Sequence, residues 1–181
     1  MYAQRIYGGT TPTAPIHARK WMAPPTGVIK VNCDASISEE GWVGLGVVAR
    51  NSEGLVLFAA TRRVRAWWPI EVAEGKALCF AIKLARNYGF HDVIFETDCL
   101  TIVNRLSRGA IYFSDLDAVL EDAIFLCRDF VSVHWSHVLR DGNAIAHHLA
   151  RLVPFGVEQR WDCHCPAEVS PYVLMDNLSS D

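Results

Sequence analysis

The sequence has no apolar run near the roughly 18 residues that a membrane-spanning helix needs. Residues 1–20 also lack the apolar stretch that is typical of a secretory signal. These two absences argue against a helical membrane protein and a secreted one. We therefore expect an intracellular protein, in the nucleus or the cytoplasm, with no membrane partner.

Paired cysteines and an excess of positive charge are missing as well. The six cysteines show no C-x-x-C spacing, and the cluster Cys163-His164-Cys165 has no second ligand pair at zinc-finger spacing. A zinc finger is therefore not expected, and the other four cysteines are interpreted as small core residues. Because the formal net charge is −3, any binding of nucleic acid has to rest on a local basic patch.

The length of 181 residues and the hydrophobic fraction of 51% are typical of one domain with short extensions. Residues 1–27 are rich in proline and glycine and are predicted to form an arm or linker, in which Trp21 can dock on the domain. The domain itself is predicted to span residues 28–155. Residues 156–181 are expected to be a partly packed extension with a mobile acidic end from Asp176 onward.

Hydrophobic periodicity predicts an α/β domain. Apolar alternation predicts strands at 28–34, 42–50, 55–64, 93–97 and 131–138, and helical spacing predicts helices at 71–88, 100–106, 115–130 and 141–153. Three antiparallel strands followed by alternating helices and strands indicate a mixed sheet covered by helices. Gly44 and Gly46 share one face of the second strand, which indicates a bulge or a close approach of another backbone.

Three acidic residues are placed where they can meet. Asp34 ends the first predicted strand, Asp98 follows the fourth, and Glu74 lies on the apolar stripe of the helix between them. Taken singly, Asp34 can be a turn residue, and Glu74 can be half solvated near the favourable end of the helix dipole. Taken together, three converging carboxylates would repel one another unless divalent cations neutralised them, and Mg²⁺ suits such oxygen ligands.

The ordered set of motifs resembles the ribonuclease H type 1 family, and more narrowly its plant retrotransposon-derived, reverse transcriptase-like branch. The resemblance covers about residues 21–176. Each motif alone is weak, and the specificity lies in their order. They are Lys30-Val31-Asn32-Cys33-Asp34-Ala35, Ala73-Glu74, Glu96-Thr97-Asp98-Cys99, and His137-Val138-Leu139-Arg140-Asp141-Gly142-Asn143 with Ala146-His147-His148-Leu149-Ala150.

The resemblance implies a five-stranded mixed sheet with helices on both faces, and cleavage of the RNA strand of RNA–DNA hybrids by two-metal catalysis. Asp34, Glu74 and Asp98 match three of the four acidic ligands of the metals, with Mg²⁺ as the expected cofactor and Mn²⁺ as a substitute. His137 matches a loop histidine that assists the attacking water or product release. Asn143 matches the loop asparagine and is assigned to substrate binding.

The fourth acidic position of the family holds His147. A neutral imidazole still ligates metals, but it removes a negative charge and is softer than the carboxylate that magnesium prefers. The expected consequence is weaker binding of one metal. Asn143 and His147 are four residues apart and share a helix face that should look toward Asp34. Asp141 is a possible substitute, although its spacing fits a helix N-cap better.

The substrate side also departs from the family, because Trp67-Trp68-Pro69 replaces the usual polar residues before the helix. Arg62 and Arg63 are candidates for contacts with a nucleic-acid backbone, and Trp68 for stacking. A solvated edge strand over packed aromatic residues is the competing interpretation.

Two functions therefore stay open. The first is a ribonuclease H-like hydrolase acting on RNA–DNA hybrid or structured RNA. The second is a nucleic-acid-binding or protein-interaction module that keeps the fold without turnover, as His147 and the acidic net charge suggest. A purely structural α/β domain is the weakest alternative, and the oligomeric state is left open.

Overall fold

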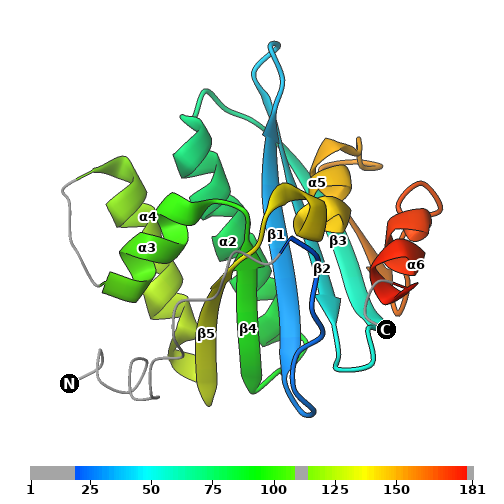
Figure 1. Ribbon diagram of the computed structural model, residues 1–181. Helices are drawn as coiled ribbons and strands as arrows, with labels where there is room; N and C mark the ends of the chain where they lie inside the picture. The colour runs from blue at the N-terminus through cyan, green and yellow to red at the C-terminus, as the bar shows by residue number, and fades with distance from the viewer. Residues whose placement is uncertain (1–18, 109–113, 179–181) are drawn as a thin grey trace.

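The computed structural model describes residues 19–108 and 114–178, and its centre is a six-stranded mixed sheet (Figure 1). The strand order is β5-β4-β1-β2-β3-β6. The strands are β1 (Ile29–Ile37), β2 (Trp42–Arg50), β3 (Val56–Arg65), β4 (Asp92–Thr97), β5 (Ser132–His137) and β6 (Glu158–Asp162). The first three are antiparallel neighbours, whereas β4 pairs parallel to β1 and β5 parallel to β4. The α/β class and the mixed sheet predicted from the sequence are thereby confirmed.

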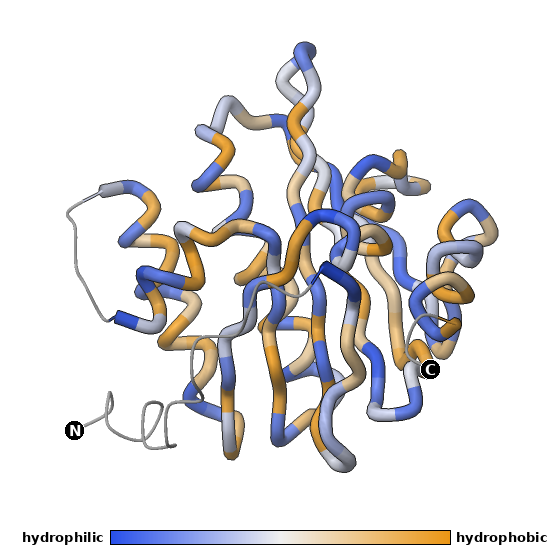
Figure 2. Tube along the Cα trace, viewed as in Figure 1, coloured by the Kyte–Doolittle hydropathy of each residue, from blue (hydrophilic) through white to orange (hydrophobic). Residues whose placement is uncertain are grey.

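The helices cover the two faces of the sheet. They are α2 (Ile70–Asn87), α3 (Leu100–Arg108), α4 (Asp115–Leu126), α5 (Ala144–Arg151) and α6 (Ser170–Leu178), with 3₁₀ turns η1 (Cys127–Asp129) and η2 (Arg140–Asn143). Helix α2 packs on β1 and β2 with α4 behind it, and α5 lies on the opposite face (Figure 1). Orange residues recur along the central strands in Figure 2, with blue and pale residues between them, and the main core is buried there. Within the described residues, no helix has both the length and the apolar character needed to cross a membrane.

The sixth strand is a correction to the prediction of five. Strand β6 lies in the predicted C-terminal extension and pairs antiparallel with β3. Its residues, Glu158 to Asp162, are mostly polar and none is fully buried, so no apolar alternation marks them in the sequence. The pairing with β3 therefore comes from tertiary context, as is common for edge strands.

Part of the acidic end belongs to a helix. Asp176 lies in α6 and its carboxylate accepts from Nη1 of Arg50 at 2.7 Å, and the mobility expected of the acidic end stays a prediction. Residues 1–18, 109–113 and 179–181 lie outside the described part, which leaves most of the predicted arm untested. Within that arm, Trp21 is 2% exposed and its ring lies 3.7 Å from the guanidinium carbon of Arg50.

Two glycines allow α5 to approach the sheet. An added Cβ at Gly44 would lie 1.8 Å from the carbonyl oxygen of Ala150, and one at Gly46 would lie 2.2 Å from that of Ala146. The close approach that was predicted for these glycines is therefore what the structure contains. Gly46 is also the cross-strand partner of Asp34, so the contact brings α5 directly against the acidic residue.

Candidate metal centre

Asp34, Glu74 and Asp98 come together although they are far apart in the sequence. Strand β1 continues to Ile37, so Asp34 lies inside the strand instead of ending it, and its side chain is fully buried. Glu74 lies in the second turn of α2 and is 6% exposed, which excludes the half-solvated position considered for it. Asp98 directly follows β4. One potential ligand atom from each residue lies within 4.8 Å of the other two.

Two oxygens of this group have no partner. Asp34 Oδ1 and Glu74 Oε2 are buried and accept no hydrogen bond. A buried carboxylate oxygen without a partner is costly, because the water that it loses is not replaced. Hard carboxylate oxygens at this separation are the ligands that a divalent cation such as Mg²⁺ prefers, so the donor set fits such an ion.

Burial and mutual repulsion both act on the protonation of the cluster. Burial, followed by the charge of Asp98, raises the pKa of Asp34 to about 7, while Arg140 opposes the shift. Burial, followed by the charges of Asp34 and Asp98, raises the pKa of Glu74 to about 9. These shifts describe carboxylates that resist being ionised together without a counter-charge.

His147 and Arg140 border the cluster on the α5 side. His147 Nδ1 lies 2.8 Å from Asp34 Oδ2, and Arg140 Nε donates to Asp98 Oδ2 at 2.5 Å. Arg140 Nη1 also lies 3.0 Å from His147 Nδ1. The predicted orientation of His147 toward Asp34 is therefore present, whereas the position of Arg140 was not predicted.

The surroundings of His147 favour its neutral imidazole. Burial, followed by the nearby charges of Arg140 and Arg151, lowers the pKa of His147. Its contact with Asp34 is therefore a hydrogen bond, not an ion pair, and we assign the proton to Nδ1. That assignment leaves Nε2 as the acceptor of the ring, and Arg140 Nη1 lies 3.5 Å from it.

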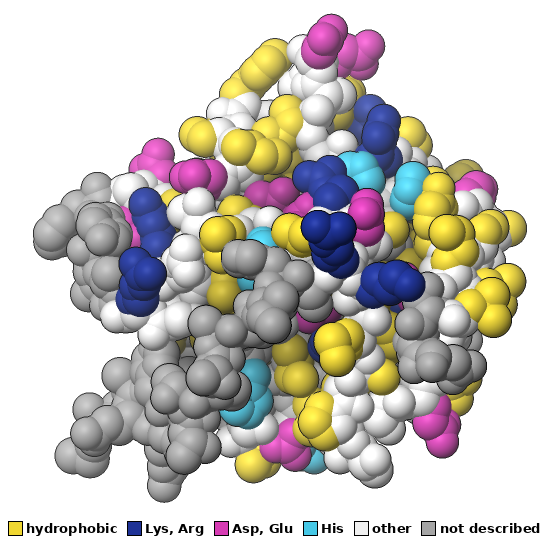
Figure 3. Space-filling model, viewed as in Figure 1, with side chains coloured by type: hydrophobic (Ala, Val, Ile, Leu, Met, Phe, Trp, Pro, Cys, Tyr) yellow, Lys and Arg dark blue, Asp and Glu magenta, His cyan; other side chains and the backbone are white. Residues whose placement is uncertain are grey.

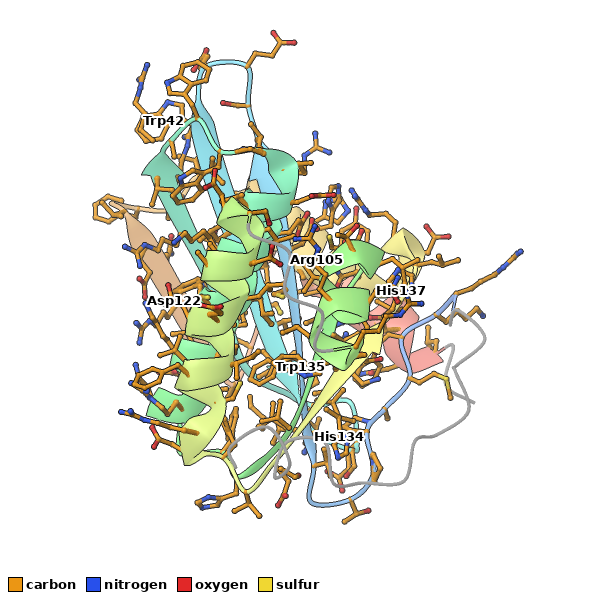
Figure 4. The ribbon with its side chains drawn as sticks, turned by 90° about the vertical axis from the view of Figure 1, so that its left-hand side faces the viewer. Trp42, Arg105, Asp122, His134, Trp135 and His137 are labelled. Carbon is orange, nitrogen blue, oxygen red and sulfur yellow. The ribbon has the colours of Figure 1, made fainter. Side chains whose placement is uncertain are left out.

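The remaining predicted site residues occupy different places. His137 ends β5, and its Nε2 lies 3.2 Å from the carbonyl oxygen of Asp98. Figure 4 shows His137 and His134 at different heights along β5. Asn143 is 1% exposed, and its amide donates to the carbonyl of Cys33 at 3.0 Å. This burial favours a role in positioning α5 over the predicted substrate contact. Asp141 is exposed and caps neither η2 nor α5, whose N-cap residues are Leu139 and Asn143.

The predicted substrate residues lie on two faces of the sheet. Arg62 and Trp68 line a groove of about 400 Å³ between β3, α2 and α4. Arg63 instead stacks on Trp42, with its guanidinium carbon 4.5 Å from the ring centre, and Trp42 is well separated from His137 in Figure 4. The three residues therefore do not form one surface. Their assignment to substrate binding stays a prediction.

A second polar cluster, which was not predicted, lies beside the acidic one on the same strand. Lys30 Nζ pairs with Glu96 Oε2 at 3.0 Å, and the amide of Asn32 donates to Glu96 Oε1 at 3.0 Å. Ser136 Oγ also donates to Glu96, and the indole of Trp21 donates to Asn32. The sequence could have indicated this cluster through its alternation, which places Lys30 and Asn32 on the same strand face as Asp34.

Charged side chains of both signs and histidines gather over the junction of β1, η2 and α5 (Figure 3). The Cys163 and Cys165 thiols differ from one another, since the first is exposed and the second is buried. Among the described residues, the only group of at least three His, Cys, Asp or Glu side chains close enough to hold a metal is the one formed by Asp34, Glu74 and Asp98.

Comparison with known proteins agrees with this geometry. Residues 32–153 match the family described as reverse transcriptase-like. RNase H1 of the halophilic archaeon Halobacterium salinarum has a similar structure, with a TM-score of 0.64 and 22% identity over 68% of this chain and 95% of that chain. The N-terminal RNase H domain of a Mycobacterium tuberculosis protein gives a TM-score of 0.62 and 23% identity over 68% and 91% of the two chains.

LC11-RNase H1, isolated from compost by a metagenomic approach, has been solved in complex with an RNA/DNA hybrid. Its TM-score is 0.62, with 21% identity over 68% of this chain and 94% of that chain. The comparison with curated proteins finds no match. Since the family match covers most of the chain, and since the acidic cluster lies on a fold shared with these structures, the chain belongs to the reverse transcriptase-like family and has the RNase H-like fold.

Proposed function

We propose that this protein is a ribonuclease H-type endonuclease that hydrolyses the RNA strand of RNA–DNA hybrids with the help of divalent metal. The observation that carries the proposal is the convergence of Asp34, Glu74 and Asp98, with two buried carboxylate oxygens that lack any partner. The hybrid bound to LC11-RNase H1, which shares the fold, supports this class of substrate. The motif order supports placement in the plant retrotransposon-derived branch.

Each residue of the cluster has a proposed role. Asp34, Glu74 and Asp98 would hold Mg²⁺, or Mn²⁺ in its place, and the bound ion would supply Lewis-acid stabilisation of charge on a phosphate. His137, whose Nε2 lies 3.2 Å from the carbonyl oxygen of Asp98, would accept or return a proton near the reacting phosphate. His147 holds Asp34 through its hydrogen bond and contributes no negative charge. Turnover is therefore expected to be slower than with a fourth carboxylate.

The direct test is hydrolysis of a labelled RNA–DNA hybrid in Mg²⁺ or Mn²⁺, compared with the Asp34→Asn variant. Loss of a residue that only supports a metal ligand typically lowers metal affinity or activity about 10- to 100-fold, so loss of a direct ligand should cost about 100-fold or more. Glu158→Gln, at an edge strand, is a control with the same loss of charge. Equal cleavage by the wild type and the Asp34→Asn variant would refute the proposed nuclease activity.

The second candidate is a nucleic-acid-binding or protein-interaction module that keeps the fold without turnover. It is favoured by His147 at the fourth acidic position and by the separation of Arg63 from Arg62 and Trp68. Fluorescence anisotropy with a labelled hybrid separates the two candidates. Tight binding without cleavage above the Asp34→Asn level identifies the module, whereas cleavage identifies the enzyme.

A further inference from the structure

Arg140 is an unexpected cation at the acidic cluster. Its side chain is 59% exposed, yet its Nε donates to Asp98 Oδ2 at 2.5 Å, and Asp98 is only 9% exposed. Its Nη1 also lies 3.0 Å from Nδ1 of His147. The guanidinium therefore lies between one acid of the cluster and the imidazole that contacts another.

Two oxygens of the cluster are already engaged on this side. Asp34 Oδ2 accepts from His147, and Asp98 Oδ2 accepts from Arg140. Two other oxygens, Asp34 Oδ1 and Glu74 Oε2, are buried without a hydrogen-bond partner. The cluster therefore offers these two buried oxygens to a metal, whereas Asp34 Oδ2 and Asp98 Oδ2 already contact the nitrogen atoms of His147 and Arg140.

A fixed positive charge at this place acts against a second ion. The guanidinium of Arg140 stays protonated, so an ion bound beside Asp98 would lie next to a like charge. Asp34 and Glu74 are almost fully buried, so water screens little of that repulsion.

We infer that the cluster holds a single divalent cation and that the Arg140 guanidinium takes the place beside Asp98 that a second ion would need. The inference rests on the proposed function in that it concerns the same metal centre. It assigns Arg140 as a residue that sets metal stoichiometry and presents a fixed positive charge at the surface of the site. It also means that restoring a carboxylate by His147→Asp is not enough, because Arg140 would pair with the new acid.

The test is a count of bound Mn²⁺, from the electron paramagnetic resonance signal of the free ion during titration of the purified chain. The expected result is one Mn²⁺ for the wild type, one for His147→Asp, and two for the double variant Arg140→Gln/His147→Asp. Asp34→Asn should lose the ion. Arg160→Gln, which removes a cation paired with Glu158 on β6, is the matched control and should bind one.

Near-ultraviolet circular dichroism of each variant verifies that its fold is retained. Two Mn²⁺ ions bound to the wild type, a double variant that stays at one, or no ion at the wild-type cluster would each overturn the inference. The outcome is separate from that of the proposed function. If one Mn²⁺ binds and the hybrid is not cleaved, the inferred stoichiometry holds and the proposed nuclease activity is refuted. If two ions bind and the hybrid is cleaved, the activity holds and the stoichiometry is refuted.

Discussion

Two polar clusters lie on the same face of β1 and differ in how their groups are satisfied. The first surrounds Asn32 and contains Lys30 and Glu96. Both carboxylate oxygens of Glu96 and the amide of Asn32 have protein partners in this cluster. The second surrounds Asp34, two residues further along, and includes two buried oxygens with none. Both clusters contact the segment from η2 to α5, through Asn143 in the first and His147 in the second.

This difference in hydrogen bonding distinguishes side chains that stabilise the fold from side chains that have oxygens free to bind a ligand. A buried polar network with all members paired fixes the relative positions of the elements that supply them. An acidic cluster with unpaired oxygens instead lowers stability until a cation binds, as is typical of functional sites. The first cluster therefore positions β1, β4, β5 and α5, and the second uses that fixed framework.

Removing Glu96 should break the paired cluster and have the largest effect on stability. The Glu96→Ala variant leaves the ammonium of Lys30 buried without its counter-charge, which typically costs about 3–5 kcal/mol. Urea unfolding monitored by circular dichroism measures the change. Glu158→Ala, at the partly exposed pair with Arg160, is the control and should cost at most about 1 kcal/mol. A loss no larger than that of Glu158→Ala would show that the Lys30–Glu96 pair does not stabilise the fold.

Adding one methyl group at Gly46 should disturb both clusters at once. Its Cβ would lie 2.2 Å from the Ala146 carbonyl and 2.3 Å from the Ala150 nitrogen, so the backbone of α5 has to move. Overpacking of this kind costs about 1–3 kcal/mol. Thermal unfolding gives the loss in stability, and titration with Mn²⁺ gives the loss in metal affinity as His147 moves. An unchanged melting temperature would show that α5 yields without strain.

The acidic cluster should make the metal-free protein less stable as the pH rises. The pKa values of Asp34 and Glu74 are raised to about 7 and about 9, above the roughly 3.9 and 4.3 of unfolded chains. Between these limits the native state binds more protons than the unfolded state, so the free energy of unfolding falls with increasing pH. We expect the melting temperature in EDTA to fall by several degrees between about pH 5 and about pH 9.

Two comparisons sharpen that prediction. Glu74→Gln should flatten the pH dependence, whereas Glu121→Gln, on the exposed side of α4, should leave it unchanged. Added Mg²⁺ should restore stability most at high pH, where the carboxylates are ionised. A melting temperature that rises with pH in the presence of EDTA would contradict the assigned repulsion.

The smallest effect is expected for Ser136→Ala. The hydroxyl donates to Glu96 Oε2 at 2.7 Å, but Lys30 holds the same oxygen, so the loss should be about 1 kcal/mol. Ser132→Ala, which removes a hydrogen bond of similar length to Asp92, is the matched control. Denaturant unfolding of both variants and of the double variant with Lys30→Met measures the coupling. No coupling between Ser136 and Lys30 would mean that they act on Glu96 independently.

Strong local patterns explain what the sequence predicted. The alternation of β1 to β3 and the helical stripe of α2 are long and regular, and the reverse transcriptase-like family and the α/β fold were confirmed. The plant retrotransposon-derived branch stays a prediction. Asp34, Glu74 and Asp98 could be placed together because Asp34 lies on β1, Asp98 directly follows the neighbouring strand β4, and Glu74 lies on the helix between β3 and β4. The catalytic and substrate roles assigned to individual residues stay predictions.

The features that were missed depend on distant contacts. Strand β6 has no apolar alternation and exists through its pairing with β3. Arg140 lies within a recognised motif, but nothing in its spacing indicates that its side chain reaches Asp98. Lys30 and Asn32 face the same side as Asp34, yet only the position of Glu96 opposite them on β4 explains why polar side chains can be buried there.

Arg50 at the end of β2 links a segment before β1 and a helix after β6 to the sheet. Its side chain is 1% exposed, stacks on Trp21 from before β1, and pairs with Asp176 from α6 after β6. The family match at residues 32–153 includes neither partner. A chain trimmed to those limits would lose both the counter-charge and the aromatic cover of Arg50, so proteolysis of either end should destabilise the domain. The smallest autonomous folding unit is therefore expected to extend from Trp21 through α6.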